Sequence, residues 1–134
     1  PVEIYGNGGN DEIYGSGFGD LIVGGSGDDQ LFPGPGDDVL LMDGTNDGAD
    51  TVTGGDGFDR LRGGGNDDHI GFKRYGGTES VEEIDGGAGV NWIVGNNLVN
   101  VLDFSATTLL NIDLIAGFGG NDTIIGTKGP DVIR

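Results

Sequence analysis

The sequence predicts an all-β fold in which short parallel strands coil into one solenoid. The first observation behind this prediction is a nine-residue unit, clearest at Gly24–Phe32, that recurs along nearly the whole chain. The second is a glycine content of 31 in 134 residues, because glycine accepts the positive φ angles that tight turns demand. The third is a large aliphatic residue at the eighth position of every unit, which is typical of a side chain that faces a core.

The units follow one another without a gap. Residues 1–5 complete an earlier unit, and thirteen units fill the rest of the chain. Three units carry extra residues, and these span 42–53, 72–85 and 104–116; in these units the sixth and eighth positions are the fourth-from-last and second-from-last residues, as in a nine-residue unit. The thirteen units begin at Gly6, Gly15, Gly24, Pro33, Met42, Gly54, Gly63, Phe72, Gly86, Gly95, Phe104, Gly117 and Gly126.

Each unit is expected to hold one short strand after a glycine-rich turn. Side chains alternate between the faces of a strand, so a strand centred on the eighth position buries that residue alone. Two nine-residue units then make one turn of the coil, about 18 residues in all. Each unit stacks on the second unit after it, which gives two opposed sheets. The aliphatic row is Ile4, Ile13, Ile22, Leu31, Leu40, Val52, Leu61, Ile70, Ile84, Ile93, Leu102, Ile115, Ile124 and Ile133.

The charge and the composition exclude several classes of partner. A net charge of -17 argues against nucleic acid, whose binding proteins present basic patches, and against adsorption to anionic membranes. The chain has no cysteine and no apolar run long enough to span a membrane. It shows no signal peptide at Pro1, and it begins and ends within the repeat register, so we expect a single module, 1–134, from a longer protein.

Acidic residues occupy one fixed place in the turns. Ten of the sixth positions hold aspartate, and clustered carboxylates beside backbone carbonyls suit a hard cation such as Ca2+. The sequence therefore predicts several bound Ca2+ ions. The expected ligands are Asp11, Asp20, Asp29, Asp38, Asp50, Asp59, Asp68, Asp113, Asp122 and Asp131, while Glu82, Asn91 and Asn100 fill the other three sixth positions.

This unit resembles the calcium-binding nonapeptide repeat of the RTX (repeats-in-toxin) family, G-G-x-G-x-D-x-U-x with U aliphatic. The resemblance implies a right-handed parallel β-roll with two short-stranded sheets and Ca2+ held between stacked turns. It is strongest over 6–71 and 117–134, which we expect to be calcium-type repeats. It is weaker over 72–116, where the repeats are degenerate and carry insertions.

The same resemblance implies which aspartates share an ion. The expected pairs are Asp11–Asp29, Asp20–Asp38, Asp38–Asp59, Asp50–Asp68 and Asp113–Asp131, with Asp29–Asp50 disturbed by the insertion at 42–53. Asparagine lowers the charge of a site, so calcium should be weak or absent between about 72 and 112. Apolar packing should replace it there, through Trp92, Val94, Leu98, Val101, Phe104 and Leu109.

A second calcium-like motif lies in the first insertion. The run Asp43-x-Thr45-x-Asp47-Gly48 is similar to the start of an EF-hand loop, but its twelfth position is Gly54 rather than glutamate. The bidentate ligand is therefore missing, and an extra ligand from Asp43 or Asp47 to a local ion is the favoured interpretation.

The outward strand positions offer one further candidate site. Tyr14, Phe32 and Trp92 could form an aromatic surface for sugar rings or for a neighbouring domain, but favourable stacking of β-forming residues in a parallel sheet is the favoured interpretation. The insertion Phe72–Tyr75 could contact an acidic polysaccharide, but a loop that covers the side of the coil is favoured. His69 is the only histidine and has no nucleophile beside it in the pattern, so we predict no enzymatic activity.

The resemblance implies a module of a secreted bacterial protein, exported by type I secretion, that is unfolded at low cytosolic calcium and folded outside the cell. We expect it to act in structure, secretion or spacing. The alternative is a carbohydrate-binding or surface-binding module attached to a polysaccharide-active enzyme or an adhesin.

Overall fold

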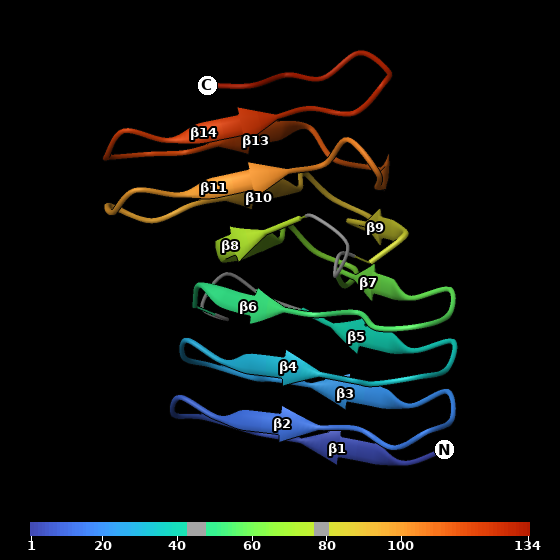
Figure 1. Cartoon of the computed structure of the whole chain (residues 1–134). Coiled ribbons are helices and arrows are strands. Elements are labelled where there is room, and N and C mark those ends of the chain that lie inside the picture. The colour runs from blue at the N-terminus through green and yellow to red at the C-terminus, as the bar shows by residue number, and fades with distance from the viewer. Residues whose placement is uncertain (43–47, 77–80) are drawn as a thin grey trace.

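A computed structural model of the chain describes residues 1–42, 48–76 and 81–134. These residues form one coil of short parallel strands, stacked in chain order from one terminus to the other (Figure 1). The EF-hand-like motif at Asp43–Asp47 lies outside the described residues. Within the described ranges, no helix is long and apolar enough to cross a membrane.

Two sheets make up the coil. The first contains β1 (Glu3–Tyr5), β3 (Leu21–Val23), β5 (Val39–Leu41), β7 (Arg60–Arg62), β9 (Glu83–Asp85) and β12 (Thr108–Leu110). The second runs through β2 (Glu12–Tyr14), β4 (Gln30–Phe32), β6 (Asp50–Val52), β8 (His69–Tyr75), β10 (Trp92–Val94) and β13 (Leu114–Ala116), and β11 (Val101–Asp103) and β14 (Thr123–Ile125) branch from β8. The predicted two-sheeted parallel solenoid is confirmed.

The aliphatic row forms the core, as predicted. Eleven of its fourteen side chains are buried, and nine of these eleven are the middle residue of a three-residue strand, whose side chain faces the core. The exceptions lie near the ends, where fewer turns cover them: Ile4 and Ile124 are partly buried, and Ile133 is 43% exposed. Full burial of one such side chain contributes about 1.5–3 kcal/mol.

The predicted turn of two nine-residue units holds only in part of the coil. Ile4 aligns with Ile22, and Ile13 with Leu31, in both cases two regular units further along the chain. Leu31 aligns with Val52, which lies in the lengthened unit at 42–53. Over the whole coil, successive turns are about 22 residues apart. The turns widen because the insertions lengthen them and, beyond β7, supply strand residues of their own.

The fork at β8 is the main departure from a regular roll. Its first residues, His69–Gly71, pair with β10, whereas Arg74 and Tyr75 pair with β11. The expectation that Phe72–Tyr75 forms a loop over the side of the coil is therefore wrong. These residues continue β8 and belong to the second sheet. The insertion at 104–116 does the same for the first sheet by supplying β12, which pairs with β9.

An aromatic cluster fills the space that the fork opens. Phe72, Tyr75 and Phe104 are at most 2% exposed, and the ring of Tyr75 lies 4.7 Å from that of Phe72 and 4.9 Å from that of Phe104. The Tyr75 hydroxyl donates to the carbonyl of Val81 at 3.0 Å and lies 2.8 Å from the Thr107 hydroxyl. These side chains extend the continuous hydrophobic core into the wider turns.

The apolar packing expected in this region is only partly present. Phe104 and Val94 are buried and Leu109 packs against the core, but Leu98 and Val101 are exposed. The missing contribution comes from Phe72, Tyr75 and Val81, which the sequence pattern did not assign to the core.

Candidate metal centre

The sixth-position side chains form columns along the coil, because nearly every one directly precedes a strand. Asp20, Asp38, Asp59 and Glu82 precede strands of the first sheet. Asp11, Asp29 and Asp50 lie along the second sheet, with Asp50 as the first residue of β6. Beyond the fork, one branch continues with Asp68, Asn91 and Asp113, and the other with Asn100 and Asp122.

One hydrogen bond repeats along each column. The backbone N–H of one sixth-position residue donates to the side chain of the next, as from Asp11 to Asp29 Oδ1 at 2.8 Å and from Asp20 to Asp38 Oδ1 at 2.7 Å. The same bond joins Asp29 to Asp50 at 2.9 Å and Asp38 to Asp59 at 2.9 Å. It continues through Glu82, Asn91, Asp113 and Asp122, each of which accepts at 2.7 to 3.1 Å.

Most of the expected pairs are therefore brought together. The bond includes Asp29 and Asp50, so the insertion at 42–53 does not separate them. The expected stacking of Asp50 on Asp68 is wrong, because the fork aligns Asp50 with Phe72 and stacks Asp68 with Asn91. Asp131 lies beyond Asp113, with Ile133 bridged to Ile115.

Among residues 1–42, 48–76 and 81–134, five carboxylates keep one buried oxygen without a hydrogen-bond partner. These atoms are Oδ2 of Asp11, Asp29, Asp38 and Asp59 and Oδ1 of Asp68, and all five are buried. An unpaired buried polar atom costs about 1–3 kcal/mol, and more when it is charged. Five such atoms at the same repeat position indicate a missing ligand, because buried polar groups in native proteins are nearly always satisfied.

Glycine at the first position of the unit leaves room beside two of these oxygens, those of Asp11 and Asp29. A Cβ atom at Gly24 would lie 2.6 Å from Asp29 Oδ2, and one at Gly6 would lie 2.8 Å from Asp11 Oδ2. Any larger residue would fill the place next to the unpaired oxygen. The glycines therefore preserve a small, oxygen-lined space at each of these two carboxylates.

The pKa values of three aspartates in the columns are raised, as expected for buried carboxylates without a cation beside them. Burial raises the pKa of Asp59 to about 6, and the charges of Asp38 and Glu82 act in the same direction. Burial likewise raises the pKa of Asp29 and of Asp38. Among the described residues, no lysine, arginine or histidine forms an ion pair with any of the five carboxylates that hold an unpaired oxygen.

Side chains alone do not complete a metal shell. In the described part of the chain, no three acidic, histidine or cysteine side chains converge on one point. Each turn brings one carboxylate, so the remaining oxygens would have to come from backbone carbonyls of the glycine-rich turns. That donor set, carboxylate and carbonyl oxygen without nitrogen or sulfur, fits Ca2+.

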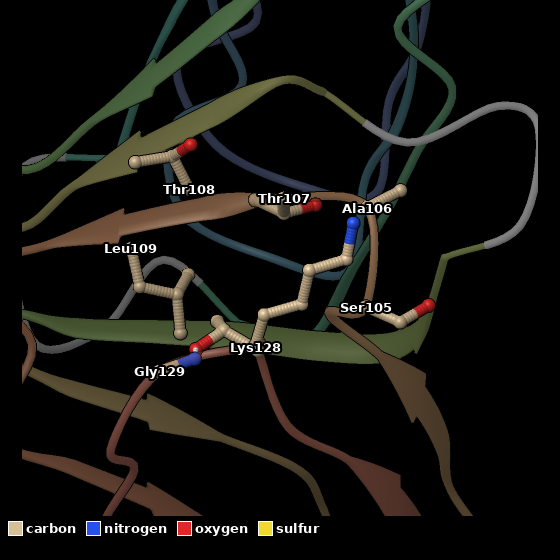
Figure 2. A pocket seen from close by; sticks show the side chains of 8 residues that line it. Ser105, Ala106, Thr107, Thr108, Leu109, Lys128 and Gly129 are labelled. Atoms are coloured by element: carbon tan, nitrogen blue, oxygen red, sulfur yellow. Dashed lines mark hydrogen bonds between the residues drawn. The ribbon is translucent and has the colours of Figure 1, made fainter.

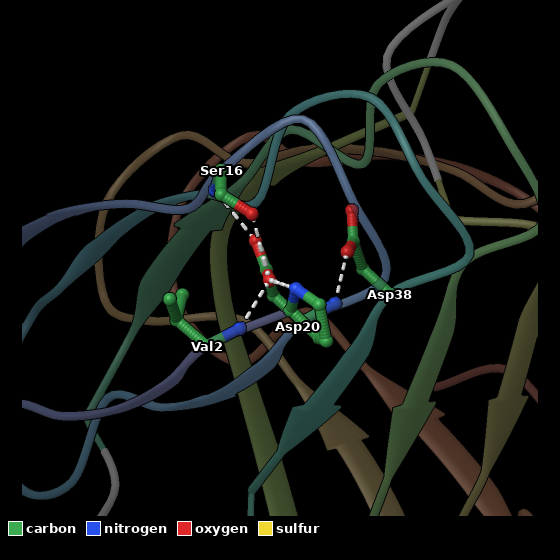
Figure 3. Close-up of polar contacts among 5 residues, drawn as sticks. Val2, Ser16, Asp20 and Asp38 are labelled. Carbon is green, nitrogen blue, oxygen red and sulfur yellow. Dashed lines mark hydrogen bonds and ion pairs between the residues drawn. The ribbon is translucent and has the colours of Figure 1, made fainter.

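Asp20 differs from its neighbours, as Figure 3 shows. Its Oδ2 accepts the backbone N–H of Ser16 at 2.5 Å, and its Oδ1 accepts the Ser16 hydroxyl at 2.9 Å and the N–H of Val2 at 2.7 Å. Burial alone would raise the pKa of Asp20, but the hydrogen bonds from Ser16 and Val2 outweigh it and lower the pKa. No oxygen of Asp20 remains unpaired.

The aromatic candidates do not form one surface. The rings of Tyr14 and Phe32, on neighbouring turns, stack at 5.0 Å, and Tyr14 is 62% exposed. Trp92 lies on the branch of the second sheet that leads to β13 and stacks on His69 at 5.2 Å. The two pairs of rings are therefore separate features.

A surface pocket of about 340 Å³ lies between β12 and the loop at 127–129 (Figure 2). Of the described residues that line it, Lys128 alone is charged, and the other polar side chains are Ser105, Thr107, Thr108 and Thr127. The lining residues that the structure describes include no histidine or carboxylate beside these hydroxyls. This pocket is also distinct from the acidic columns.

Comparison with known proteins gives one match. The family model of the RTX calcium-binding nonapeptide repeat (4 copies) matches residues 5–40, 44–71 and 112–134. These ranges contain every carboxylate with an unpaired oxygen and leave out Asn91 and Asn100. No curated protein and no solved structure matches the chain.

Proposed function

The chain belongs to the RTX calcium-binding nonapeptide repeat family and forms a calcium-binding β-roll, and we propose that Ca2+ is what folds this roll. The observation that carries the proposal is the set of five buried carboxylate oxygens without a partner. In the proposal, Asp11, Asp29, Asp38, Asp59 and Asp68 hold calcium together with backbone carbonyls. For Asp20, Asp50, Asp113, Asp122 and Asp131 the role of ligand stays a prediction from the sequence.

The physical basis of calcium-driven folding is linkage. A ligand that binds only the folded state stabilises it by RT ln(1 + [L]/Kd) for each site, which is about 2.7 kcal/mol at a hundredfold excess over Kd. Each proposed site needs loops from stacked turns, so the unfolded chain offers no equivalent. Without the ion, the columns bury like charges beside one another, which opposes the compact state.

This arrangement supports a role in secretion. RTX repeats are typical of secreted bacterial proteins. A chain that needs calcium to fold stays extended where calcium is scarce, inside the cell, and folds where calcium is plentiful, outside it. We therefore place the module in a secreted bacterial protein exported by type I secretion, where it acts as a structural, secretion-assisting or spacer domain without catalytic activity.

Circular dichroism with a calcium titration tests the proposal. The spectrum in chelator should be that of a largely disordered chain, and millimolar Ca2+ should convert it to a β spectrum. Mg2+ at the same concentration is the matched control and should have a much smaller effect, because Mg2+ demands stricter geometry and loses its water reluctantly. A β spectrum of full intensity in chelator would contradict calcium-driven folding.

One observation favours a second function, the binding of a carbohydrate. The Tyr14–Phe32 stack lies on the outer face of the second sheet, and exposed aromatic residues are a frequent element of binding surfaces. Tyr14→Ala and Phe32→Ala should then weaken binding on a glycan array while the calcium-loaded fold persists. Tyr5→Ala is the matched control, because Tyr5 is 56% exposed on the first sheet. A wild-type protein that binds no glycan would remove this candidate.

A further inference from the structure

The loops fall into two conformations, which differ at the second position of the unit. In the first conformation this residue has a positive φ, for example 99° at Gly25 and 98° at Gly34. Four loops of this kind have a sixth-position aspartate that keeps an unpaired Oδ2. The four second-position residues are Asn7, Gly25, Gly34 and Gly55, and the corresponding aspartates are Asp11, Asp29, Asp38 and Asp59.

In the second conformation, the residue at the second position has no positive φ and hydrogen-bonds to its own sixth position. The Thr127 N–H donates to Asp131 Oδ2 at 2.9 Å, and the Thr127 hydroxyl donates to Asp131 Oδ1 at 3.0 Å. Ser16 makes the same two bonds to Asp20 (Figure 3). In both loops, the second-position residue engages both carboxylate oxygens, one through its backbone N–H and the other through its hydroxyl.

The loop of Asp68 shows which part of this arrangement matters. The Gly64 N–H donates to Asp68 Oδ2 at 2.7 Å, so this loop has the second conformation, but glycine has no hydroxyl to offer. Asp68 Oδ1 accordingly remains buried and unpaired. In the loops of Asp20 and Asp131, the hydroxyl at the second position donates to Oδ1, the oxygen that stays unpaired in Asp68, and Asp20 Oδ1 also accepts the Val2 N–H.

Asparagine at the sixth position satisfies the loop in another way. Asn91 Oδ1 accepts the N–H of Asp68 at 3.1 Å, and its Nδ2 donates to the carbonyl of Asn111 at 3.1 Å and to that of Gly87 at 3.4 Å. Gly87 has a φ of 78°, so this loop has the first conformation. An N–H donor thus takes the place that an unpaired carboxylate oxygen has in the aspartate loops.

The loop of Asn100 combines the hydrogen bond from the second-position N–H with a side-chain amide that donates hydrogen bonds of its own. Its Oδ1 accepts the backbone N–H of Asn96, the second-position residue, at 2.9 Å. Its Nδ2 donates to Asn96 Oδ1 and to the carbonyl of Lys73, both at 3.2 Å. The Asn100 side chain therefore has both polar atoms engaged within the protein, and it has no negative charge that a cation could balance.

We infer that the second-position side chains Ser16 and Thr127, and the amides of Asn91 and Asn100, determine which loops hold calcium by replacing the ion with hydrogen bonds. The inference rests on the proposed function and narrows it. Loops that carry an unpaired carboxylate oxygen take the ion, and the loops of Asp20 and Asp131 do not. Calcium is then concentrated between residues 6 and 68. In the wider turns beyond residue 68, hydrogen bonds hold the loops together without the ion.

Counting bound calcium per chain by native mass spectrometry tests the inference. Asp20→Asn and Asp29→Asn are a matched pair. Asp20→Asn should bind as many ions as the wild type, and Asp29→Asn should bind at least one fewer. A lower count for Asp20→Asn would overturn the inference. An unchanged count for Asp29→Asn would contradict the proposed function itself, so the two failures are distinguishable.

Two gain-of-site variants test the inference in the opposite direction. Ser16→Gly frees Asp20 from the hydroxyl and permits a positive φ, and Asn91→Asp restores a carboxylate beside Gly87. Each should bind one ion more than the wild type. Ser16→Thr keeps the hydroxyl and is the control that should gain none. A gain in neither Ser16→Gly nor Asn91→Asp would overturn the inference.

Discussion

The backbone N–H of Asp29 donates to Oδ1 of Asp50 in the next turn of the second sheet, while Oδ2 of Asp29 itself stays buried without a partner. Asp29 Oδ1 also accepts the N–H of Asp11, so this residue links three successive turns. A single side chain therefore serves both the hydrogen-bonded column and the proposed calcium shell.

Asp29→Ala should consequently affect calcium-driven folding more than the loss of one ordinary contact. The variant removes an acceptor from Asp11 and a proposed ligand, so the midpoint of the calcium titration should move to at least several-fold higher concentration. Asn100→Ala is the contrasting variant, because Asn100 is fully buried but neutral. It should lower the thermal stability of the calcium-loaded protein and leave the number of bound ions unchanged. Equal losses of calcium from the two variants would contradict the division of the chain.

Phe104→Ala should destabilise the wider turns without a direct effect on calcium. Phe104 is fully buried and stacks on Tyr75, and truncation of a buried phenylalanine typically costs about 3–5 kcal/mol. Chemical denaturation at saturating calcium would measure this loss. Leu98→Ala is the control, because Leu98 is 63% exposed and its loss should cost less than about 0.5 kcal/mol. Comparable losses from both variants would show that the aromatic cluster is not a stabilising core.

The sequence predicts the core row well because the eighth position recurs in every unit, across all three insertions. It could not place Phe72 and Tyr75, because an insertion interrupts the period and leaves no register to show which side chains point inward. Their burial follows from the alignment of Arg74 with Val101, which is a long-range contact. Local patterns fix strand centres, whereas the fork depends on which strands meet.

The candidate site shows the same division between local and long-range information. The sixth position is a property of each unit, and the pairs Asp11–Asp29 and Asp20–Asp38 follow from regular stacking. The contrast between Gly25 and Ser16 has a sequence signal, a hydroxyl residue four positions before the aspartate. Its meaning requires the structure, since only the hydrogen bonds show that Ser16 satisfies Asp20.

Phe118 offers a test of backbone strain in the last turns. It occupies a second position with a φ of 64°, a conformation that costs a residue with a Cβ about 1–2 kcal/mol. The side chain is 61% exposed, so little packing would be lost on its removal. Phe118→Gly should therefore raise the free energy of unfolding by about 1 kcal/mol in denaturant titrations at fixed calcium. Phe18→Gly is the control without positive φ at a similarly exposed phenylalanine, and it should not stabilise the protein.

Gly57 and Gly17 provide the sharpest comparison of close approach between turns. Gly57 has a φ of 137°, and a Cβ atom built on it would overlap the carbonyl oxygen of Gly36 in the neighbouring turn. Gly17 has no positive φ, and a Cβ atom there would meet nothing within 4 Å. Gly57→Ala should therefore lower the thermal midpoint of the calcium-loaded protein and weaken calcium binding, because the loop that contains Asp59 must shift. Gly17→Ala should leave both quantities close to those of the wild type. If both variants behaved like the wild type, the turns at Gly36 and Gly57 would not be packed as closely as the structure shows, and the proposed shell at Asp38 and Asp59 would lose its geometric basis.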